Sequence, residues 1–347
     1  MIGQRLIDWY SSNKRCLPWR DAEDPYLIWV SEIILQQTRV AQGLDYYRRF
    51  VNAFPDIFSL ARADIDEVLK IWQGLGYYSR ARNMHTAARY IVDVHQGIFP
   101  ATYDGLISIK GIGDYTAAAI ASFAFGQAVP VVDGNVNRVI ARWYGIEQPV
   151  NKSAGQKEIR AHAEELMVRE APGTFNQAIM EFGALQCVPK NPDCDGCIFN
   201  RICAAFQSGL VDILPVKAKT VNIATRYFHY LHVRWGNRTF IRRRGDGDIW
   251  TGLYEFPIIE TDSEAGFNDL IHTPAWQSFF EGQTPIIKVV SPEITHRLTH
   301  RILKIRFYEI TVDRAISGLE LIEIQESDLN RYAVPIVIDH YLNSLRG

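Results

Sequence analysis

The chain has 347 residues, of which 47% are hydrophobic and 22% are charged, and its formal net charge is −2. This length predicts two domains or three, because single hydrophobic cores rarely grow past roughly 250–300 residues. The chain begins without an apolar run long enough for a signal peptide or a membrane helix, so we expect a cytoplasmic protein with no membrane partner. Total charge does not exclude nucleic acid, since phosphate contact needs only a local basic face.

The chain to about residue 208 is predicted to form helices joined by short Gly and Pro turns. Apolar residues recur at helical spacing in 60–73, 81–94 and 116–125. Earlier, Glu32 leads the apolar run of 31–38. If Glu32 faces a dry pocket, burial will raise its carboxyl pKa. The alternative is an exposed glutamate on an amphipathic helix.

Residues 106–117 have the pattern of a helix, a tight turn and a second helix, with Gly111 and Gly113 on either side of Ile112. Glycines adopt backbone angles that other residues avoid, and here they expose main-chain N–H groups at a helix start. Such a turn binds a phosphate without a charged side chain. The alternative is a plain glycine turn, but the apolar spacing on both sides favours a helix-hairpin-helix that contacts DNA.

Asp133 precedes Gly134 and Asn135 at another predicted helix start. A carboxylate in this position can point into a cleft or can serve as the helix N-cap. Two acids with separated pKa values could divide acid and base work. The sequence by itself does not bring Asp133 and Glu32 together.

Four of the five cysteines lie in one stretch, as Cys187-x6-Cys194-x2-Cys197-x5-Cys203. This density without a secretion signal indicates metal ligands and not disulfides. Zinc ligands usually come as two Cys-x-x-Cys pairs. One such pair flanked by single cysteines favours a cubane iron–sulfur cluster over zinc. We expect the fifth, Cys16, to be a half-buried apolar residue.

The pattern changes after a predicted linker at 209–221. Segments 227–233 and 239–241 flank Gly236-Asn237, which predicts a β-hairpin. Residues 304–312 alternate in the manner of a strand. The domain at 222–347 is therefore predicted to be mixed α/β.

The hairpin, the Val-Asp-Gly-Asn segment at 132–135 and the cysteine spacing, in this order, resemble the endonuclease III superfamily of DNA glycosylases. Segments 17–20, 32–38, 73–83 and 175–178 further resemble its MutY-type adenine DNA glycosylases. The resemblance implies a multidomain α plus α/β protein. Its helical glycosylase region would span 1–208, with a six-helix module at about 22–133 and an iron–sulfur module formed by the N-terminal helix plus about 134–208.

The C-terminal domain resembles the Nudix-like 8-oxoguanine recognition domain of these enzymes, most clearly at 250–257. The acidic Nudix box is absent, so we expect no pyrophosphohydrolase activity. The family's Phe-Ser-His loop corresponds to Leu298-Thr299-His300. Loss of the aromatic at Leu298 puts the strength of lesion discrimination in question.

The resemblance implies a monomeric, monofunctional glycosylase of base excision repair that removes adenine opposite 8-oxoguanine or G in double-stranded DNA. It also implies a [4Fe–4S] cluster on the four clustered cysteines. Where lyases of the superfamily carry the lysine that attacks the sugar, this chain has Tyr115, whose phenol cannot form a Schiff base. The alternatives are a bifunctional glycosylase/lyase for oxidised pyrimidines and a non-catalytic iron–sulfur DNA-binding protein.

By the same resemblance Glu32 protonates N7 of a flipped adenine, Asp133 stabilises the oxocarbenium ion, and Tyr115 and Asn135 organise the site. The residues implied to contact substrate or DNA are Trp19, Arg20, Gln37, Leu75, Tyr77, Gly111, Gly113, Gln177, Leu298, Thr299 and His300. Gln37 and Tyr77 match residues that insert into the base stack. Ordinary packing at a helix end and in a turn is the alternative for both.

Overall fold

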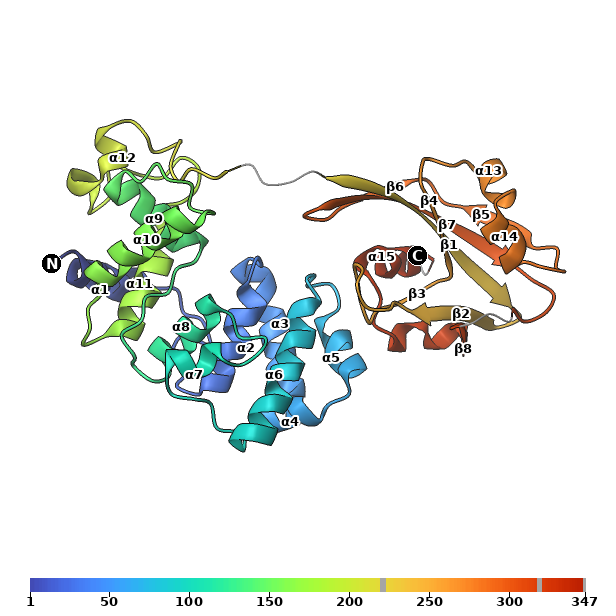
Figure 1. Cartoon of the computed structure of the whole chain (residues 1–347), viewed down its shortest axis with the longest axis horizontal. Coiled ribbons are helices and arrows are strands. Elements are labelled where there is room, and N and C mark those ends of the chain that lie inside the picture. Colours follow the sequence, from blue (N-terminus) through green and yellow to red (C-terminus); the bar gives the residue numbers. More distant parts are fainter. Residues whose placement is uncertain (219–222, 317–319, 346–347) are drawn as a thin grey trace. The chain divides into compact units, whose positions relative to one another are not determined.

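The computed structural model describes residues 1–218, 223–316 and 320–345 (Figure 1). The chain forms two compact units, one of Met1–Ala63 with Asn83–Lys219 and one of Asp64–Arg82 with Thr220–Gly347. The end of the predicted linker, 219–221, and residues 222, 317–319 and 346–347 of the predicted C-terminal domain lie outside the described residues. Within the described ranges, no helix is long and apolar enough to cross a membrane.

The first 218 residues are helical. The helices are α1 (Ile2–Asn13), α2 (Pro25–Leu35), α3 (Val40–Ala53), α4 (Ile57–Arg62), α5 (Ile65–Trp72), α6 (Ser79–His95), α7 (Tyr103–Ile107), α8 (Asp114–Phe123), α9 (Gly134–Tyr144), α10 (Ser153–Leu166), α11 (Pro172–Leu185), the 3-10 turn η1 (Asn200–Ile202) and α12 (Ala204–Gln207). The helical periods at 81–94 and 116–125 are confirmed by α6 and α8. The helical spacing at 60–73 belongs to two helices, α4 and α5, because the Asp64 side chain accepts a hydrogen bond from the Asp66 N–H and caps a new helix there.

Helix α2 is the central helix of the first unit. The Asp24 carboxylate caps it by accepting from the Tyr26 N–H, and Pro25 suits the first helical position. Its sides are apolar almost all round, and eight of its 11 residues are buried. It packs against α8, whose small buried residues at 117–119 allow close approach. This packing places the last turns of α2 beside the first turn of α8.

A second core of the same unit joins the N-terminal helix to the segment that carries the cysteines. Leu6 of α1, Val139 of α9 and Phe182 of α11 pack there with Phe199 and Cys203. Arg5 adds a hydrogen bond of 2.6 Å from its Nη2 to the Ile198 carbonyl. The N-terminal helix and the cysteine loop therefore share one hydrophobic core.

The second unit contains an eight-stranded mixed sheet. Besides α5, its elements are β1 (Ala224–Trp235), β2 (Arg238–Arg243), β3 (Tyr254–Glu255), β4 (Ile258–Thr261), α13 (Phe267–Ile271), α14 (Pro274–Phe279), β5 (Ile286–Val290), β6 (Ile294–Arg297), β7 (Arg301–Thr311), β8 (Ile322–Gln325), the 3-10 helix η2 (Glu326–Arg331) and α15 (Ile336–Ser344). Strands β1 and β7 pair in parallel, and the pairs β1–β2, β1–β4, β2–β3, β2–β8, β5–β7 and β6–β7 are antiparallel. Trp235 pairs with Arg238 across a Gly236-Asn237 turn, which confirms the predicted hairpin. A helical domain followed by a mixed α/β domain is the predicted fold class.

Candidate active site

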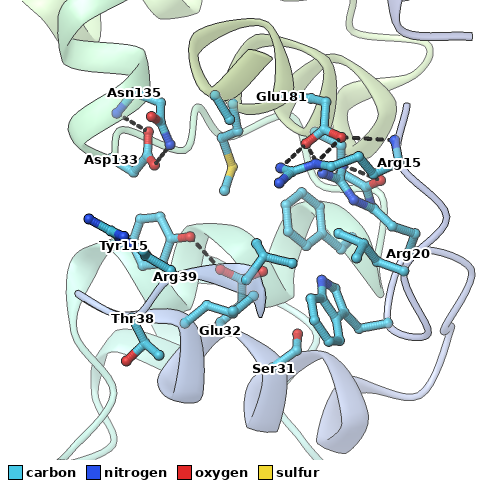
Figure 2. A pocket seen from close by; sticks show the side chains of 18 of the residues that line it. Arg15, Arg20, Ser31, Glu32, Thr38, Arg39, Tyr115, Asp133, Asn135 and Glu181 are labelled. Atoms are coloured by element: carbon cyan, nitrogen blue, oxygen red, sulfur yellow. Dashed lines mark hydrogen bonds and ion pairs between the residues drawn. The ribbon is translucent and has the colours of Figure 1, made fainter. Parts of the chain in front are cut away.

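Glu32 lies in the last turn of α2 and lines a cavity of about 530 Å³ in the first unit (Figure 2). Its side chain is buried, with 6% of its surface exposed, so the alternative of an exposed glutamate is wrong. Burial raises the pKa of Glu32 to about 7, and the charge of Asp133 adds to this effect. The carboxyl is therefore poised to exchange a proton near neutral pH.

Tyr115 stands in the first turn of α8, directly after the glycine hairpin, and its hydroxyl donates a hydrogen bond to Glu32 Oε2 (Figure 2). Burial raises the pKa of Tyr115 well above its ordinary value. The phenol therefore remains a hydrogen-bond donor throughout the neutral range. Within the described part of the chain, no lysine lines the cavity.

Asp133 has both of the positions that the sequence left open, at a helix N-cap and in a cavity. It is the N-cap of α9, accepting from the N–H groups of Asn135 (2.8 Å) and Val136 (2.7 Å), and it also lines the cavity. Its second oxygen accepts from Asn135 Nδ2 at 2.8 Å. Burial raises the pKa of Asp133, while these donors and the helix N-terminus favour the ionised carboxylate.

The far wall of the cavity carries an ion triad that the sequence did not reveal. Glu181 is almost fully buried and receives Arg15 Nη2 at 2.6 Å and Arg20 Nη2 (Figure 2). Burial would raise the pKa of Glu181, but hydrogen bonds from Arg15 and the charge of Arg20 hold it below its ordinary value. Gln177, predicted as a pocket residue, lies one helical turn earlier on the same face of α11, and that spacing is the signal that could have found Glu181.

The predicted pocket residues Trp19, Arg20 and Gln177 all line this cavity. Trp19 is buried and packs edge-on against Tyr47, with ring centroids 5.1 Å apart. Gln177 Oε1 accepts from the Tyr10 hydroxyl at 2.6 Å. The cavity thus offers, besides the two acids, an aromatic side chain and an oriented amide, which suit a planar heterocycle.

Arg138 connects the acids to the cysteine loop. Its Nη2 donates to Asn135 Oδ1 at 2.9 Å and to the Gly183 carbonyl at 2.6 Å, and its Nε donates to the Cys187 carbonyl at 2.7 Å. The guanidinium is buried, and these oxygens accept from three of its five N–H donors. The orientation of the Asn135 amide beside Asp133 is therefore tied to the backbone of a predicted metal ligand.

The glycine hairpin has the backbone expected of a phosphate-binding turn. Gly111 has φ 103°, and Ile112 is buried. A Cβ on Gly113, the N-cap of α8, would have no atom within 4 Å, so the space in front of the α8 N–H groups is open. Gln37 is exposed just after α2 with φ 56°, a left-handed conformation that is uncommon for a non-glycine residue.

The four clustered cysteines line one small cavity of the first unit. The buried Arg142 lies beside them, with Nη1 3.4 Å from Cys187 Sγ. Among the described residues, neither this cluster nor any other group of three His, Cys, Asp or Glu side chains is arranged to hold a metal ion. Cys16 is exposed, so its expected half-burial is wrong.

The second unit brings together the other predicted DNA contacts. A cavity of about 460 Å³ is lined by Leu75, Tyr77 and the segment Leu298-Thr299-His300. Tyr77 is 48% exposed, and its hydroxyl lies 2.9 Å from Thr299 Oγ1. Leu75 is buried, so it packs in the loop and does not project from it.

Comparisons with known proteins agree with this geometry. A model of the HhH-GPD superfamily base excision DNA repair proteins matches residues 30–168, and a NUDIX domain model matches residues 229–344. The chain is similar to the solved structure of a thermostable thymine-DNA glycosylase, with a TM-score of 0.55 and 27% identity over 59% of this chain and 95% of that chain. A trapped endonuclease III–DNA covalent intermediate shares the fold, with a TM-score of 0.52 at 19% identity over 60% of this chain and 95% of that chain. Fold and site together define a helix-hairpin-helix DNA glycosylase.

Curated relatives narrow this class. The adenine DNA glycosylase of Buchnera aphidicola (subsp. Baizongia pistaciae) is 33% identical over 90% of this chain and 86% of that protein. Its counterpart from the subsp. Schizaphis graminum is 34% identical over 75% of this chain and 76% of that protein. The human enzyme is 43% identical over 58% of this chain and 39% of that protein. The chain belongs to the adenine DNA glycosylase family of base excision repair enzymes, as the sequence resemblance predicted.

Proposed function

We propose that this protein hydrolyses the N-glycosidic bond of adenine mispaired with 8-oxoguanine or G in duplex DNA and leaves an abasic site. One observation carries the proposal: Glu32 and Asp133 line a single cavity, and each has an environment suited to a different role. A binding protein needs no such pair. The relatives' shared name supports adenine as the base.

Glu32 is the general acid of this reaction. With a pKa of about 7, a substantial fraction is protonated at neutral pH and can protonate N7 of the extruded adenine, which turns the base into a better leaving group. The electron pair of the glycosidic bond departs with the base, and the sugar becomes an oxocarbenium ion. The ionised Glu32 can then accept a proton from the attacking water.

Asp133 faces the positive sugar carbon as a carboxylate. Its oxygens are held by Asn135 and by the start of α9, so it can stabilise the oxocarbenium ion without reorganising. Retaining glycosidases use a pair of carboxyl groups in the same way to cleave a glycosidic bond.

Trp19, Arg20 and Gln177 would line the adenine pocket. Gln37 and Tyr77 would enter the base stack and offset an unstacking cost of a few kcal/mol.

Cys187, Cys194, Cys197 and Cys203 would hold a [4Fe–4S] cluster. Four thiols around one cavity with the buried Arg142 cation beside them fit a cluster whose ligands are thiolates. When bound, the cluster supplies a cross-link that fixes the loop and its exposed Lys190 and Arg201 near the DNA backbone, and no redox step is needed.

Leu298, Thr299 and His300 would contact 8-oxoguanine in the opposite strand. We propose that the protein is a monomer and that it works on nucleoid DNA in the cytoplasm.

The test uses purified protein and duplexes that carry A:8-oxoguanine, A:G or an oxidised pyrimidine, assayed with and without alkali. Strand breaks from the A:8-oxoguanine duplex only after alkali would support the proposal. Breaks without alkali would support the bifunctional lyase, and no base release from any duplex would support the non-catalytic alternative.

Glu32→Gln and Asp133→Asn test the two acids directly. Each should abolish excision and leave duplex binding largely intact, because neither change alters the shape of the cavity. Near-normal single-turnover excision by either variant would contradict the role given to that residue.

A further inference from the structure

The loop at 74–78 is anchored at both ends within the second unit. Gln73, the C-cap of α5, donates from Nε2 to Asp339 Oδ1 of α15 at 2.7 Å. Its Oε1 accepts from the Val334 N–H at 3.2 Å. At the other end, the Tyr78 hydroxyl donates to the Val334 carbonyl at 3.4 Å and accepts from the Gly74 N–H at 3.1 Å. The loop is thereby fixed to 334–339.

A lysine one turn earlier completes the anchor. Lys70 Nζ donates to Gln73 Oε1 at 3.1 Å and to the Tyr332 carbonyl at 3.0 Å. The Gln73 amide is therefore held through both its oxygen and its nitrogen. Because hydrogen bonds to charged groups are stronger than neutral ones, Lys70 and Asp339 define one orientation of this amide.

The anchored loop has a backbone that needs such support. Gly74 (φ 91°), Gly76 (φ 78°) and Tyr77 (φ 48°) all have left-handed angles, which suit glycine but strain tyrosine. A Cβ on Gly76 would meet nothing within 4 Å, so this glycine serves the turn and not a close contact. Strained residues persist where the surroundings over-determine them. The strained residue here is Tyr77, which is half exposed and lies beside Thr299.

We infer that Gln73, with Lys70 and Asp339, is a positioning device that holds Tyr77 in its inserting conformation. The inference rests on the proposed function, in which Tyr77 enters the base stack. It gives residues 332–339 a role in repair, since they would set the geometry of adenine extrusion without touching DNA. Gln73, Lys70 and Asp339 are positioning residues, and their effect should pass through Tyr77.

A double-mutant cycle tests this coupling. Asp339→Ala and Tyr77→Ala are made singly and together, and unstacking is followed by the fluorescence of 2-aminopurine placed next to the mispaired adenine, at saturating protein. Single-turnover excision is measured in parallel. Asp339→Ala alone should lower both the fluorescence gain and the excision rate, the latter roughly tenfold, since one hydrogen bond to a charged group is lost. In the Tyr77→Ala background the same change should have little further effect.

Two more variants separate positioning from general destabilisation. Asp339→Asn keeps an acceptor oxygen for Gln73 and should restore most of the fluorescence gain. Ser344→Ala, on the same helix, removes only a bond to the Tyr341 carbonyl and should behave as the wild type. Equal losses from Asp339→Ala in both backgrounds would overturn the inference while the inserting role of Tyr77 stands. A fully active Tyr77→Ala would overturn that role, and the inference with it.

Discussion

The Tyr115 hydroxyl donates a hydrogen bond to Glu32 Oε2 inside the cavity that Asp133 also lines. This bond favours the ionised carboxylate and so opposes the burial that raises the pKa of Glu32 to about 7. By the sequence resemblance, Tyr115 stands where lyases of the superfamily carry a lysine. On this alignment, the side chain that replaces the lyase lysine also lowers the pKa of Glu32.

The pH dependence of excision should reflect this carboxyl. Because Glu32 must be protonated to act as the acid, the single-turnover rate should fall as the pH rises through about 7. The raised pKa also means that its contribution to folding stability is full below the ordinary value of 4.5 and is lost as the pH rises through about 7. Rates measured from acid to alkaline pH on a saturating duplex check the first statement, and a flat profile across neutrality would contradict it.

Tyr115→Phe should shift the alkaline limb of that profile. The hydrogen bond from Tyr115 lowers the pKa of Glu32, and burial raises it. Without this hydrogen bond the pKa of Glu32 should rise further, and the alkaline limb should move to higher pH. The maximal rate should drop by roughly tenfold, because the carboxyl loses one orienting hydrogen bond. A profile identical to that of the wild type would show that the bond has no catalytic role.

Arg138→Met should weaken both the active site and the cysteine loop. It removes the hydrogen bonds of Arg138 to the carbonyls of Gly183 and Cys187 and frees the Asn135 amide, which should cost about 3 kcal/mol of unfolding free energy. Denaturant unfolding, iron analysis and excision assays measure the three effects. Arg169→Met, at an exposed position, is the control, and equal behaviour of the two variants would exclude a special role for Arg138.

Cys197→Ser should lower the iron content and the melting temperature, the latter by more than about 5 °C, since metal binding is coupled to folding. Duplex affinity should fall with it, while any excision by the remaining folded protein should keep its pH profile. Cys16→Ser removes the exposed thiol and should leave iron content unchanged. Normal folding and affinity of a protein without iron would contradict the structural role of the cluster.

The two hairpin glycines should respond differently to alanine. In Gly111→Ala, the Cβ would lie 2.8 Å from the Asn83 carbonyl oxygen at φ 103°, so we expect a loss of about 2 kcal/mol of stability. Gly113→Ala meets no atom and should fold normally, but its methyl would stand where a phosphate approaches, so duplex affinity should fall several-fold. Denaturant unfolding and binding titrations distinguish these outcomes. Equal stability of the two variants would contradict the hairpin geometry.

Features that depend on neighbouring residues could be predicted from the amino-acid sequence. The spacing of glycines around Ile112, the Gly236-Asn237 turn and the grouping of Cys187 to Cys203 are local, because backbone angles and short loops act over a few residues. The resemblance built on such segments predicted the fold class and the family correctly. Local reasoning also found each acid as a candidate.

Which distant residues meet depends on how the helices pack in the fold. Asp133 and Glu32 are brought to one cavity by the packing of helices far apart in sequence, and that burial, which no local pattern measures, sets the pKa of Glu32. The same packing buries Glu181 against two arginines and ties Arg138 to Cys187, and these contacts have no sequence signature beyond helical spacing. Hydrogen bonds and desolvation act through space, and the sequence specifies them only through the fold.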